Sequence, residues 1–395
     1  MKITIVGGGF GGVKTALELA KHSHNHVTLI SDKPDFQYFP ALYGTATGKS
    51  HLQAWVSLGT IFAGKLNVDV IIDSIATVDP AAKTLTGGTG NTYHYEHLVL
   101  ALGAVTTYFG IEGLDQYTYG IKSESEIAKL KHHLYQEMAE ERMLDKQYVI
   151  IGGGPTGVEL ASALGSYIES LSKHYKLRHR KIGVTLIEGS PRLLPRMSEQ
   201  TSKHVYNRLR KIGVKIQLNK KVESANDDGL IVSGNPLKSN TVIWTSGVAN
   251  HPFYDANAEH FEFSKNHKIV VNDYMRTKDG IYVIGDNAFT PFSGLAQTAL
   301  HDALFISTNF KRRQQNKVLK KYTVVSPPVV VPVGESWAVF EWHKLRMHGW
   351  PAALLRQAAD LIGYHDVLPI GHALGAWRAQ RVIEDNYFTP TAPKK

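Results

Sequence analysis

Two glycine patterns in this chain have the spacing that binds the pyrophosphate of a dinucleotide. The first pattern contains Gly7, Gly9, Phe10, Gly11 and Gly12, and the second contains Gly152, Gly154, Pro155, Thr156 and Gly157. Glycines at the first, third and sixth positions let the backbone turn sharply and let an anion lie against the amides of a helix N-terminus. One such pattern is weak evidence, but two copies, each between an apolar run and a helical pattern, predict two dinucleotide sites.

The residue that ends the next strand of each unit predicts which nucleotide the unit prefers. In the second unit, residues 184–187 form an apolar strand that ends on Glu188. A carboxylate there accepts hydrogen bonds from the ribose hydroxyls and repels a 2′-phosphate, so NADH is predicted over NADPH. In the first unit the matching strand, residues 27–30, ends on Ser31 and is followed by Asp32. The sequence leaves open which of these two residues meets the ribose.

Short apolar runs predict the strands that position these residues. Runs at residues 3–6 and 148–151 precede the two glycine patterns, and runs at residues 98–103, 242–247 and 281–286 end in small residues. The last run ends on Gly285 and Asp286, and an acid there can hydrogen-bond a ribityl hydroxyl of FAD. The predicted fold class is therefore α/β, with two Rossmann-like dinucleotide-binding domains. The FAD domain is interrupted by the nicotinamide domain.

Breaks in these patterns give the predicted domain bounds. Residues 1–113 and 268–324 form the FAD-binding domain, residues 114–267 the NADH-binding domain, and residues 325–395 a C-terminal α+β region. Further strands are predicted at residues 68–72, 75–78, 268–271, 329–333 and 337–342, and a helix at residues 127–142. Residues 35–44 are aromatic and rich in turn-forming types, which fits a packed surface loop or part of a binding site.

The C-terminal region contains two amphipathic helical patterns. From Trp350 onward, Leu354, Leu355, Ala358, Leu361 and Ile362 share one face, and Arg356, Gln357 and Asp360 share the other. In the second pattern, Ile370, Leu374 and Trp377 oppose Arg378 and Arg381. Such helices pack on the body of the protein or lie in a membrane interface. The clustering of tryptophan and arginine, together with the basic net charge, favours the interface.

The composition excludes several kinds of chemistry. The 395 residues include no cysteine, which removes disulfides, thiolate metal ligands and redox-active dithiols. The net charge of +9 favours a membrane, a nucleic acid or an anionic substrate without choosing among them. The sequence shows no secretory leader and no apolar run of the roughly 18 residues that span a bilayer. We therefore expect a cytosolic protein or one peripheral to a membrane.

Two basic runs and a group of histidines allow further interpretations. Residues 173–181 and 311–313 are solvated surface or contacts to phosphate lipids or nucleic acid. No recognition motif accompanies them, so nucleic-acid binding is not expected. His22, His24 and His26 lie between a predicted helix and a predicted strand without a carboxylate cluster, so no metal site is predicted.

Over most of its length the chain resembles the type II NADH dehydrogenases, or NADH:quinone oxidoreductases. The matching motifs are residues 7–12, 40–43 with 46–48, 98–103, 152–160, 242–247 and 285–286, and residues 152–160 are the most specific. The resemblance implies FAD and NADH as the two dinucleotides and a quinone as the electron acceptor. It also implies C-terminal helices that bind one leaflet of a membrane, at its cytoplasmic face, and it leaves a homodimer open.

The same resemblance implies roles for residues outside the glycine patterns. Pro40 and its neighbours would line the isoalloxazine, Gln297 would lie beside the quinone, and Glu159 would relay protons near the flavin. From the residues alone, Glu159 is equally a helix residue that faces its neighbour. The remaining predicted cofactor contacts are Ile75, Ala101, Gly103, Ser246, Gly247 and Ala296.

One stretch departs from the family pattern, because His301 and Asp302 stand where the family has a Gln-Gln pair. The quinone site is therefore expected to be altered. The predicted reaction passes a hydride from NADH to the flavin and electrons on to a membrane quinone, without proton pumping. The alternatives are a flavoprotein with a non-quinone acceptor and a basic binding protein with a redox switch. Sulfide:quinone oxidoreductases share the fold, but their chemistry needs cysteine thiolates, which this chain lacks.

Overall fold

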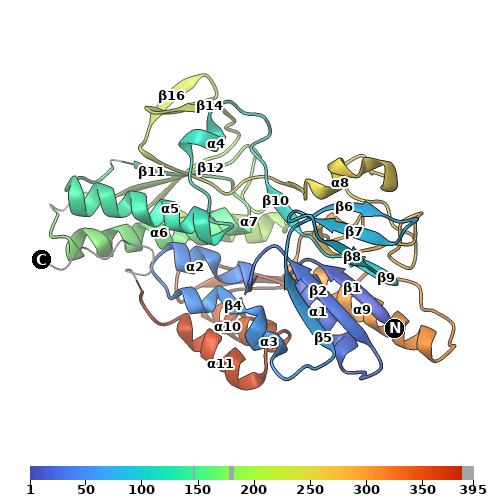
Figure 1. Cartoon of the computed structure of the whole chain (residues 1–395). Helices are drawn as coiled ribbons and strands as arrows, with labels where there is room; N and C mark the ends of the chain where they lie inside the picture. Colours follow the sequence, from blue (N-terminus) through green and yellow to red (C-terminus); the bar gives the residue numbers. More distant parts are fainter. Residues whose placement is uncertain (146, 178–181, 385–395) are drawn as a thin grey trace, which may run out of the picture.

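The two glycine patterns lie on two separate parallel sheets in the computed structural model, which describes residues 1–145, 147–177 and 182–384 (Figure 1). The first sheet has the parallel strand order β19-β9-β1-β2-β5. Its strands are β1 (Lys2–Val6), β2 (His26–Ser31), β5 (Val68–Ile72), β9 (His97–Leu100) and β19 (Tyr282–Val283). Helices α1 (Phe10–Ala20) and α9 (Ala296–Gln314) pack against each other beside it. Because β19 and α9 follow the second unit in the chain, the first unit is discontinuous, as predicted.

The second sheet has the parallel strand order β13-β12-β11-β17. Its strands are β11 (Gln147–Ile151), β12 (Gly183–Ile187), β13 (Val214–Gln217) and β17 (Thr241–Trp244), with helices α5 (Glu124–Tyr135), α6 (Pro155–His174) and α7 (Glu199–Lys211). An antiparallel sheet of β14 (Val222–Asn226), β15 (Gly229–Val232) and β16 (Asn235–Lys238) belongs to the same unit. All four residues of β17 are buried, as expected of a parallel strand covered on both faces.

Short elements connect the two units and complete the first. Strands β10 (Ala104–Thr106) and β18 (Val248–Asn250), which carry the chain out of and back toward the first unit, pair with each other in antiparallel fashion. The other strands are β3 (Asp35–Gln37), β4 (Trp55–Ser57), β6 (Ile75–Asp79), β7 (Thr84–Gly87) and β8 (Thr92–His94). The short helices are η1 (Phe39–Ala41), α2 (Leu42–Ala46), η2 (His51–Gln53), α3 (Leu58–Phe62), α4 (Leu114–Tyr117), η3 (Gln136–Glu140), α8 (Phe253–Ala256), η4 (Ala258–His260) and η5 (Gly285–Asn287).

The C-terminal region forms a small antiparallel sheet followed by two helices. These elements are β20 (Val329–Pro332), β21 (Ala338–Trp342), β22 (Leu345–Gly349), α10 (Trp350–His365) and α11 (Ile370–Ala379). After α11 the chain returns to the first unit, where the Ser50 amide donates to the Val382 carbonyl and the Glu384 amide donates to the Gly48 carbonyl. The Glu384 carboxylate also accepts hydrogen bonds from Ser50 and His51. The tail is thus fixed against the segment that follows α2.

Three local predictions were incomplete or wrong. Residues 268–271 do not form a strand, because only Ile269 of the four is fully buried and it makes isolated bridges instead of a ladder. The helix predicted at residues 127–142 begins earlier, at a capping box of Ser123 and Glu126, and becomes π-helical from Gln136. Strand β22 was not predicted, because its polar and apolar residues give no clear alternation. Among the described residues, no helix is both long and apolar enough to cross a membrane.

Candidate functional site

The two glycine turns have the same tight backbone geometry. Gly7 and Gly152 both have a φ of +115°, a conformation that side-chain-bearing residues rarely adopt. A Cβ atom on Gly12 would lie 1.9 Å from the Gly7 carbonyl oxygen, and one on Gly157 would lie 1.8 Å from the Gly152 carbonyl oxygen. The first and last glycine of each pattern are therefore required by the turn itself and by the approach of helix to strand.

The middle glycine of each pattern faces open space instead. A Cβ atom on Gly9 or Gly154 would meet no protein atom within 4 Å. These residues are also the N-caps of α1 and α6, which begin at Phe10 and Pro155. Each helix thus presents its first amides to a space that the protein leaves unfilled, which suits the pyrophosphate of a dinucleotide.

The strand register identifies which residues of the two units occupy the same position. The last paired residue of β2 against β1 is Ile30, and the last paired residue of β12 against β11 is Ile187. Ser31 in the first unit therefore corresponds to Glu188 in the second. Asp32 lies one step further and is exposed.

Ser31 and Glu188 also face their glycine turns in the same way. The Glu188 carboxylate accepts hydrogen bonds from the Gly153 amide at 2.5 Å and the Ser190 amide at 2.6 Å. In the first unit, a Cβ atom on Gly8 would lie 2.4 Å from Ser31 Oγ, which donates to the Lys33 carbonyl at 2.7 Å. The position after the second strand of each unit is thus a carboxylate in the second unit and a neutral hydroxyl in the first.

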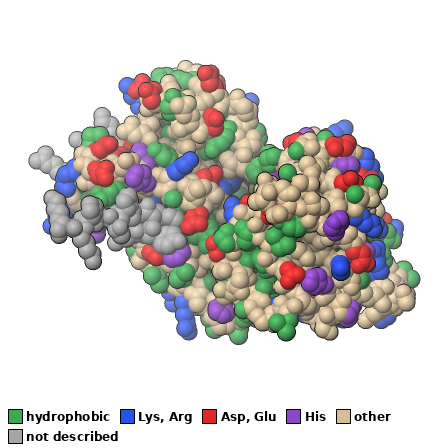
Figure 2. All heavy atoms as spheres, viewed as in Figure 1, with side chains coloured by type: hydrophobic (Ala, Val, Ile, Leu, Met, Phe, Trp, Pro, Cys, Tyr) green, Lys and Arg blue, Asp and Glu red, His purple; other side chains and the backbone are tan. Residues whose placement is uncertain are grey.

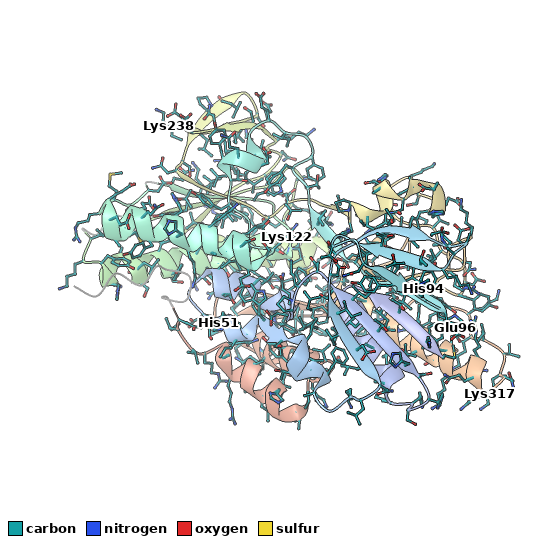
Figure 3. All side chains as sticks on the ribbon, in the orientation of Figure 1. His51, His94, Glu96, Lys122, Lys238 and Lys317 are labelled. Carbon is teal, nitrogen blue, oxygen red and sulfur yellow. The ribbon has the colours of Figure 1, made fainter. Side chains whose placement is uncertain are left out.

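Lys122 lies between the two units and was not singled out by the sequence (Figure 3). Its ammonium group donates to the Gly247 carbonyl at 2.8 Å, and its own carbonyl accepts from Gln37 Nε2 at 2.5 Å. Ser246 lies next to Gly247, and its hydroxyl reaches the Ile151 carbonyl at 3.3 Å. The segment at the end of β17 is therefore tied both to the second glycine turn and to the residues just before Pro40.

Asp286 follows β19 at the carboxyl edge of the first sheet. Burial raises the pKa of its carboxyl, whereas the charges of Lys268 and Lys122 lower it. The Lys268 ammonium group also donates to the Asp286 backbone carbonyl. The preceding residue, Gly285, is fixed by a hydrogen bond, because its amide donates to the buried Asp302 carboxylate at 2.9 Å.

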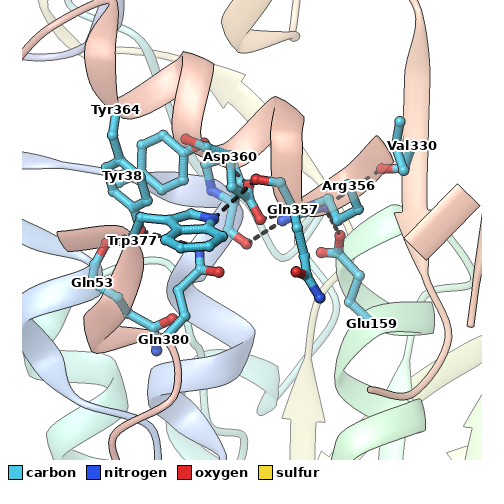
Figure 4. A network of polar contacts seen from close by, with 11 residues as sticks. Tyr38, Gln53, Glu159, Val330, Arg356, Gln357, Asp360, Tyr364, Trp377 and Gln380 are labelled. Atoms are coloured by element: carbon cyan, nitrogen blue, oxygen red, sulfur yellow. Dashed lines mark hydrogen bonds and ion pairs between the residues drawn. The ribbon is translucent and has the colours of Figure 1, made fainter. Parts of the chain in front are cut away.

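Glu159 lies on α6 in a buried polar network that extends to the C-terminal region (Figure 4). Its Oε1 atom is 3.0 Å from Nη1 of Arg356, a residue of α10. Arg356 Nε contacts Asp360 at 2.9 Å, and Arg356 Nη2 donates to the Pro40 carbonyl at 2.8 Å. Burial raises the pKa of Glu159 to about 7, although Arg356 acts to lower it. A carboxyl with this pKa exchanges protons near neutral pH.

Helix α9 carries the residues predicted for the quinone site. Ala296 and Gln297 lie in its first turn, and Gln297 is exposed. Asp302 is fully buried and accepts a hydrogen bond from the Tyr322 hydroxyl at 2.6 Å, in addition to the one from Gly285. His301 Nε2 lies 2.9 Å from the Thr323 carbonyl. The two residues that depart from the family pattern therefore anchor residues 322–323 and the Gly285 turn.

The other predicted residues have mixed surroundings. Phe10 packs against Phe36, with 5.0 Å between ring centroids, while Ile75 is buried at the start of β6. Ala101 lies against the first glycine turn, since its carbonyl oxygen is 2.2 Å from the Cβ position of Gly7.

The basic run at residues 173–181 is described only in part. Residues 173–177 lie at the end of α6 and just after it, and residues 178–181 lie outside the described residues. His26 pairs with Asp69 at 2.9 Å, and the described residues include no group of three potential metal ligands.

Lys122, Lys268 and Arg356 are the charged residues of this site that the sequence did not reveal. Each is brought into the site by tertiary packing, and none belongs to a motif. Arg356 was expected on the polar face of an amphipathic helix, which would ordinarily be its solvent face. The sequence did contain a signal for one ion pair, because Arg356 and Asp360 are four positions apart on the same predicted helix.

Two glycine turns of this kind, one on each of two parallel sheets, are typical of a dinucleotide-dependent oxidoreductase. The model of the pyridine nucleotide-disulphide oxidoreductase family matches residues 1–303, and the chain belongs to that family. Similar curated proteins are the type II NADH:quinone oxidoreductases of Staphylococcus saprophyticus and Staphylococcus aureus. The former is 27% identical over 91% of this chain and 94% of its own length, and the latter is 25% identical over 94% and 97%.

Solved structures share the fold at lower identity. NDH2 from Plasmodium falciparum in complex with NADH superimposes with a TM-score of 0.85 at 18% identity and covers 96% of this chain and 98% of its own. The sulfide:quinone oxidoreductase of Aquifex aeolicus gives a TM-score of 0.77 at 19% identity, covering 96% and 91%. Because each superposition covers 96% of this chain, the shared fold includes the C-terminal region.

Proposed function

We propose that this chain is a type II NADH:quinone oxidoreductase, which oxidises NADH and reduces a membrane quinone without pumping protons. The observation that carries the proposal is the pair of equivalent glycine turns, each of which joins a strand of a parallel sheet to the N-terminus of a helix. The similarity to curated proteins of this activity over nearly their full length supports it. The absence of cysteine argues against the sulfide chemistry of the structural relative, because that chemistry needs thiolates.

The first unit is suited to FAD and the second to NADH. Open space at Gly9 beside the N-terminus of α1, and the half-buried Asp286 carboxyl at the sheet edge, fit the pyrophosphate and ribityl groups of FAD. In the proposed arrangement Gly7, Gly12 and Ser31 complete that site. Bound FAD would supply the hydride acceptor and the electron donor of the reaction. The domain bounds proposed from the sequence follow this division.

The proposal is tested by steady-state turnover of the purified holoprotein in lipid vesicles. NADH oxidation is expected to depend on added quinone and to be slow with oxygen alone. Oxidation that is fast with oxygen and unaffected by quinone would instead support an oxidase, the activity named for a structural relative from Lactobacillus brevis. Electron transfer only to protein acceptors would support the non-quinone alternative.

Glu188 is expected to set the preference for NADH over NADPH. Replacing it by serine, the residue at the corresponding position of the first unit, removes both a ribose hydrogen-bond acceptor and the charge that repels a 2′-phosphate. We expect Glu188→Ser to reduce the ratio of kcat/KM for NADH to that for NADPH by roughly tenfold or more. Glu199→Ser, at an exposed position that begins α7, is the control and should leave the ratio unchanged. An unchanged ratio in Glu188→Ser would mean that another residue meets the ribose.

Helix α10 is amphipathic in the opposite sense to an ordinary surface helix. Its polar residues Arg356 and Asp360 face inward, whereas Trp350, Leu354 and Ile362 are 68%, 55% and 63% exposed. These apolar residues recur every four or eight positions and so form one stripe. An exposed apolar stripe that includes a tryptophan is typical of a helix that lies in a membrane interface. We infer peripheral binding to the cytoplasmic face of the membrane through this helix; a homodimer stays a prediction.

Replacing the apolar stripe should release the protein from lipid. Leu354→Asp and Ile362→Asp each remove a large apolar side chain from the interface, which is worth about 1.5–3 kcal/mol when fully buried. Each variant is therefore expected to weaken binding to vesicles of anionic lipid by roughly tenfold, measured by co-sedimentation. Leu66→Asp is the control, because Leu66 is 99% exposed and belongs to the first unit, just before β5, and not to α10. Equal binding by all three variants would contradict the proposed membrane face.

The redox-switched binding protein remains the less favoured alternative. On the face shown in Figure 2, lysine and arginine side chains are interspersed with acidic and histidine side chains. A nucleic-acid surface would gather cations along one groove or stripe. Steeply salt-dependent DNA binding, without quinone turnover, would nevertheless support this alternative.

A further inference from the structure

Arg356 connects three parts of the chain that are far apart in sequence. It lies on the inward face of α10, and its guanidinium contacts Glu159 of α6, the Pro40 carbonyl that precedes α2, and Asp360 of its own helix (Figure 4). Its side chain is 12% exposed, and that of Glu159 is 11% exposed. A planar guanidinium with several donors can hold two carboxylates and a carbonyl in fixed geometry, which a lysine cannot do.

We propose that Arg356 is a positioning residue that keeps Glu159 a reversible proton carrier at the junction of the two nucleotide units. The inference rests on the proposed quinone reductase function. It assigns to α10 a second role besides lipid contact, because the same helix that presents its apolar side outward supplies this cation inward.

The charges in the network explain why one cation decides the state of Glu159. Arg356 faces two carboxylates, Glu159 and Asp360, so the three groups together carry a net negative charge when both acids are ionised. Binding of one proton brings the total charge of these three side chains to zero. Burial raises the pKa of Glu159 to about 7, the Arg356 charge lowers it, and the Asp360 charge raises it. Without Arg356, two buried carboxylates would lack their cation, and Glu159 would hold its proton to higher pH.

Other titratable groups face the network from neighbouring elements. Tyr43 of α2 senses the charges of both Arg356 and Glu159, and burial raises its pKa, so it stays neutral. Tyr38 donates to Asp360 at 3.1 Å, and its pKa is likewise raised by burial. Lys49 lines the same small pocket as Pro40, Arg356 and Asp360, and burial lowers its pKa. Glu335 acts on Tyr43 and Lys49 from the C-terminal region. Of the titratable groups named here, Arg356 is the one that forms an ion pair with Glu159, at 3.0 Å.

The proton balance of the reaction requires such a carrier. Oxidation of NADH by a quinone converts NADH, one proton and quinone into NAD⁺ and quinol. The hydride supplies two electrons and one proton, so the second proton of the quinol must come from solution by way of the protein. A carboxyl that releases a proton and regains it near neutral pH can supply it, whereas one that stays protonated cannot.

The test compares the pH dependence of quinone reduction by the holoprotein in vesicles. We expect Arg356→Gln to move the pH midpoint of kcat that Glu159 sets upward by roughly one to three units. Arg356→Lys keeps the positive charge but loses the planar guanidinium with its several donors, so its shift of the pH midpoint should be smaller. Arg378→Gln, at an exposed position of α11, is the matched control and should show no shift. In a Glu159→Gln background, Arg356→Gln should change the pH profile no further, because it acts through Glu159.

A second measurement does not depend on activity. The folded-state pKa of Glu159 is raised, so its stabilising contribution is present below its ordinary pKa and is lost as pH rises toward about 7. The difference in unfolding temperature between the wild type and Glu159→Gln should therefore change over this window. With Arg356 replaced by lysine or glutamine, the window should extend to higher pH. If Arg356→Gln does not fold, both measurements are made on Arg356→Lys instead.

These readouts separate the inference from the proposed function. Arg356 variants that lose turnover with unchanged pH midpoints in both measurements would overturn the inference and leave the quinone reductase function standing. A wild-type protein that does not reduce quinone would overturn the function. In that case the unfolding measurement alone would still decide whether Arg356 controls the proton on Glu159.

Discussion

Gly157→Ala is expected to give a protein that keeps its flavin but is no longer reduced by NADH. The new Cβ atom would lie 1.8 Å from the Gly152 carbonyl oxygen and 2.8 Å from Thr245 Oγ1, so the turn and the start of α6 must separate. The amides that would hold the pyrophosphate then lose their position. The first sheet is built from other strands and should retain its nucleotide.

Gly12→Ala is the mirror experiment in the first unit. Its Cβ atom would lie 1.9 Å from the Gly7 carbonyl oxygen, so the purified protein should be colourless or bind FAD weakly. The control is Gly165→Ala on α6, where the nearest atom, Val184 Cγ2, would be 3.6 Å away, an ordinary contact. Absorption spectra before and after anaerobic addition of NADH distinguish the three variants. Reduction of Gly157→Ala by NADH at the wild-type rate, or loss of flavin from it alone, would show that the two sites are exchanged or misplaced.

Asp302→Ala is expected to destabilise the protein by about 2–5 kcal/mol, because two donors lose their buried acceptor at once. The donors are the Gly285 amide and the Tyr322 hydroxyl, at 2.9 and 2.6 Å. Since Gly285 precedes Asp286, the variant should also bind FAD less tightly. Unfolding of the holoprotein, followed by flavin fluorescence and by circular dichroism, measures both effects.

His301→Gln is the matched comparison for Asp302→Ala. A glutamine amide can still donate to the Thr323 carbonyl that His301 contacts, so stability and quinone turnover should change little. If His301→Gln instead changes the acceptor that the protein uses, the two residues serve the quinone site directly. If Asp302→Ala is as stable as the wild type, the Gly285 turn does not depend on this carboxylate.

The nucleotide units could be predicted from the sequence because their determinants are local. Each glycine turn lies within six residues of its strand and helix, and Glu188 directly follows the strand that pairs with the one before the turn. In the first unit, the pairing of β2 with β1 shows that Ser31, and not Asp32, occupies the position that corresponds to Glu188. Turn geometry and strand register act within a single supersecondary unit.

The polar network around Glu159 could not be predicted, because it depends on long-range packing. Arg356 and Glu159 are 197 positions apart, and Arg356 lies on the helix face that sequence reasoning would assign to solvent. The return of Glu384 to Ser50 spans 334 positions and has no local signal. Residues 268–271 show the opposite error, since the apolar pattern predicted a strand but Ile269 forms only isolated bridges, to Phe263 and Ala288.

The most direct test of the account is anaerobic reduction of the purified holoprotein by NADH, followed by addition of a short-chain quinone. We expect the flavin absorption to bleach with NADH, to bleach more slowly with NADPH, and to return rapidly when quinone is added. Bleaching without recovery would contradict the assigned acceptor and direct the search to other oxidants. A flavin that NADH does not bleach would contradict the central claim that the second unit binds NADH and delivers its hydride to the first.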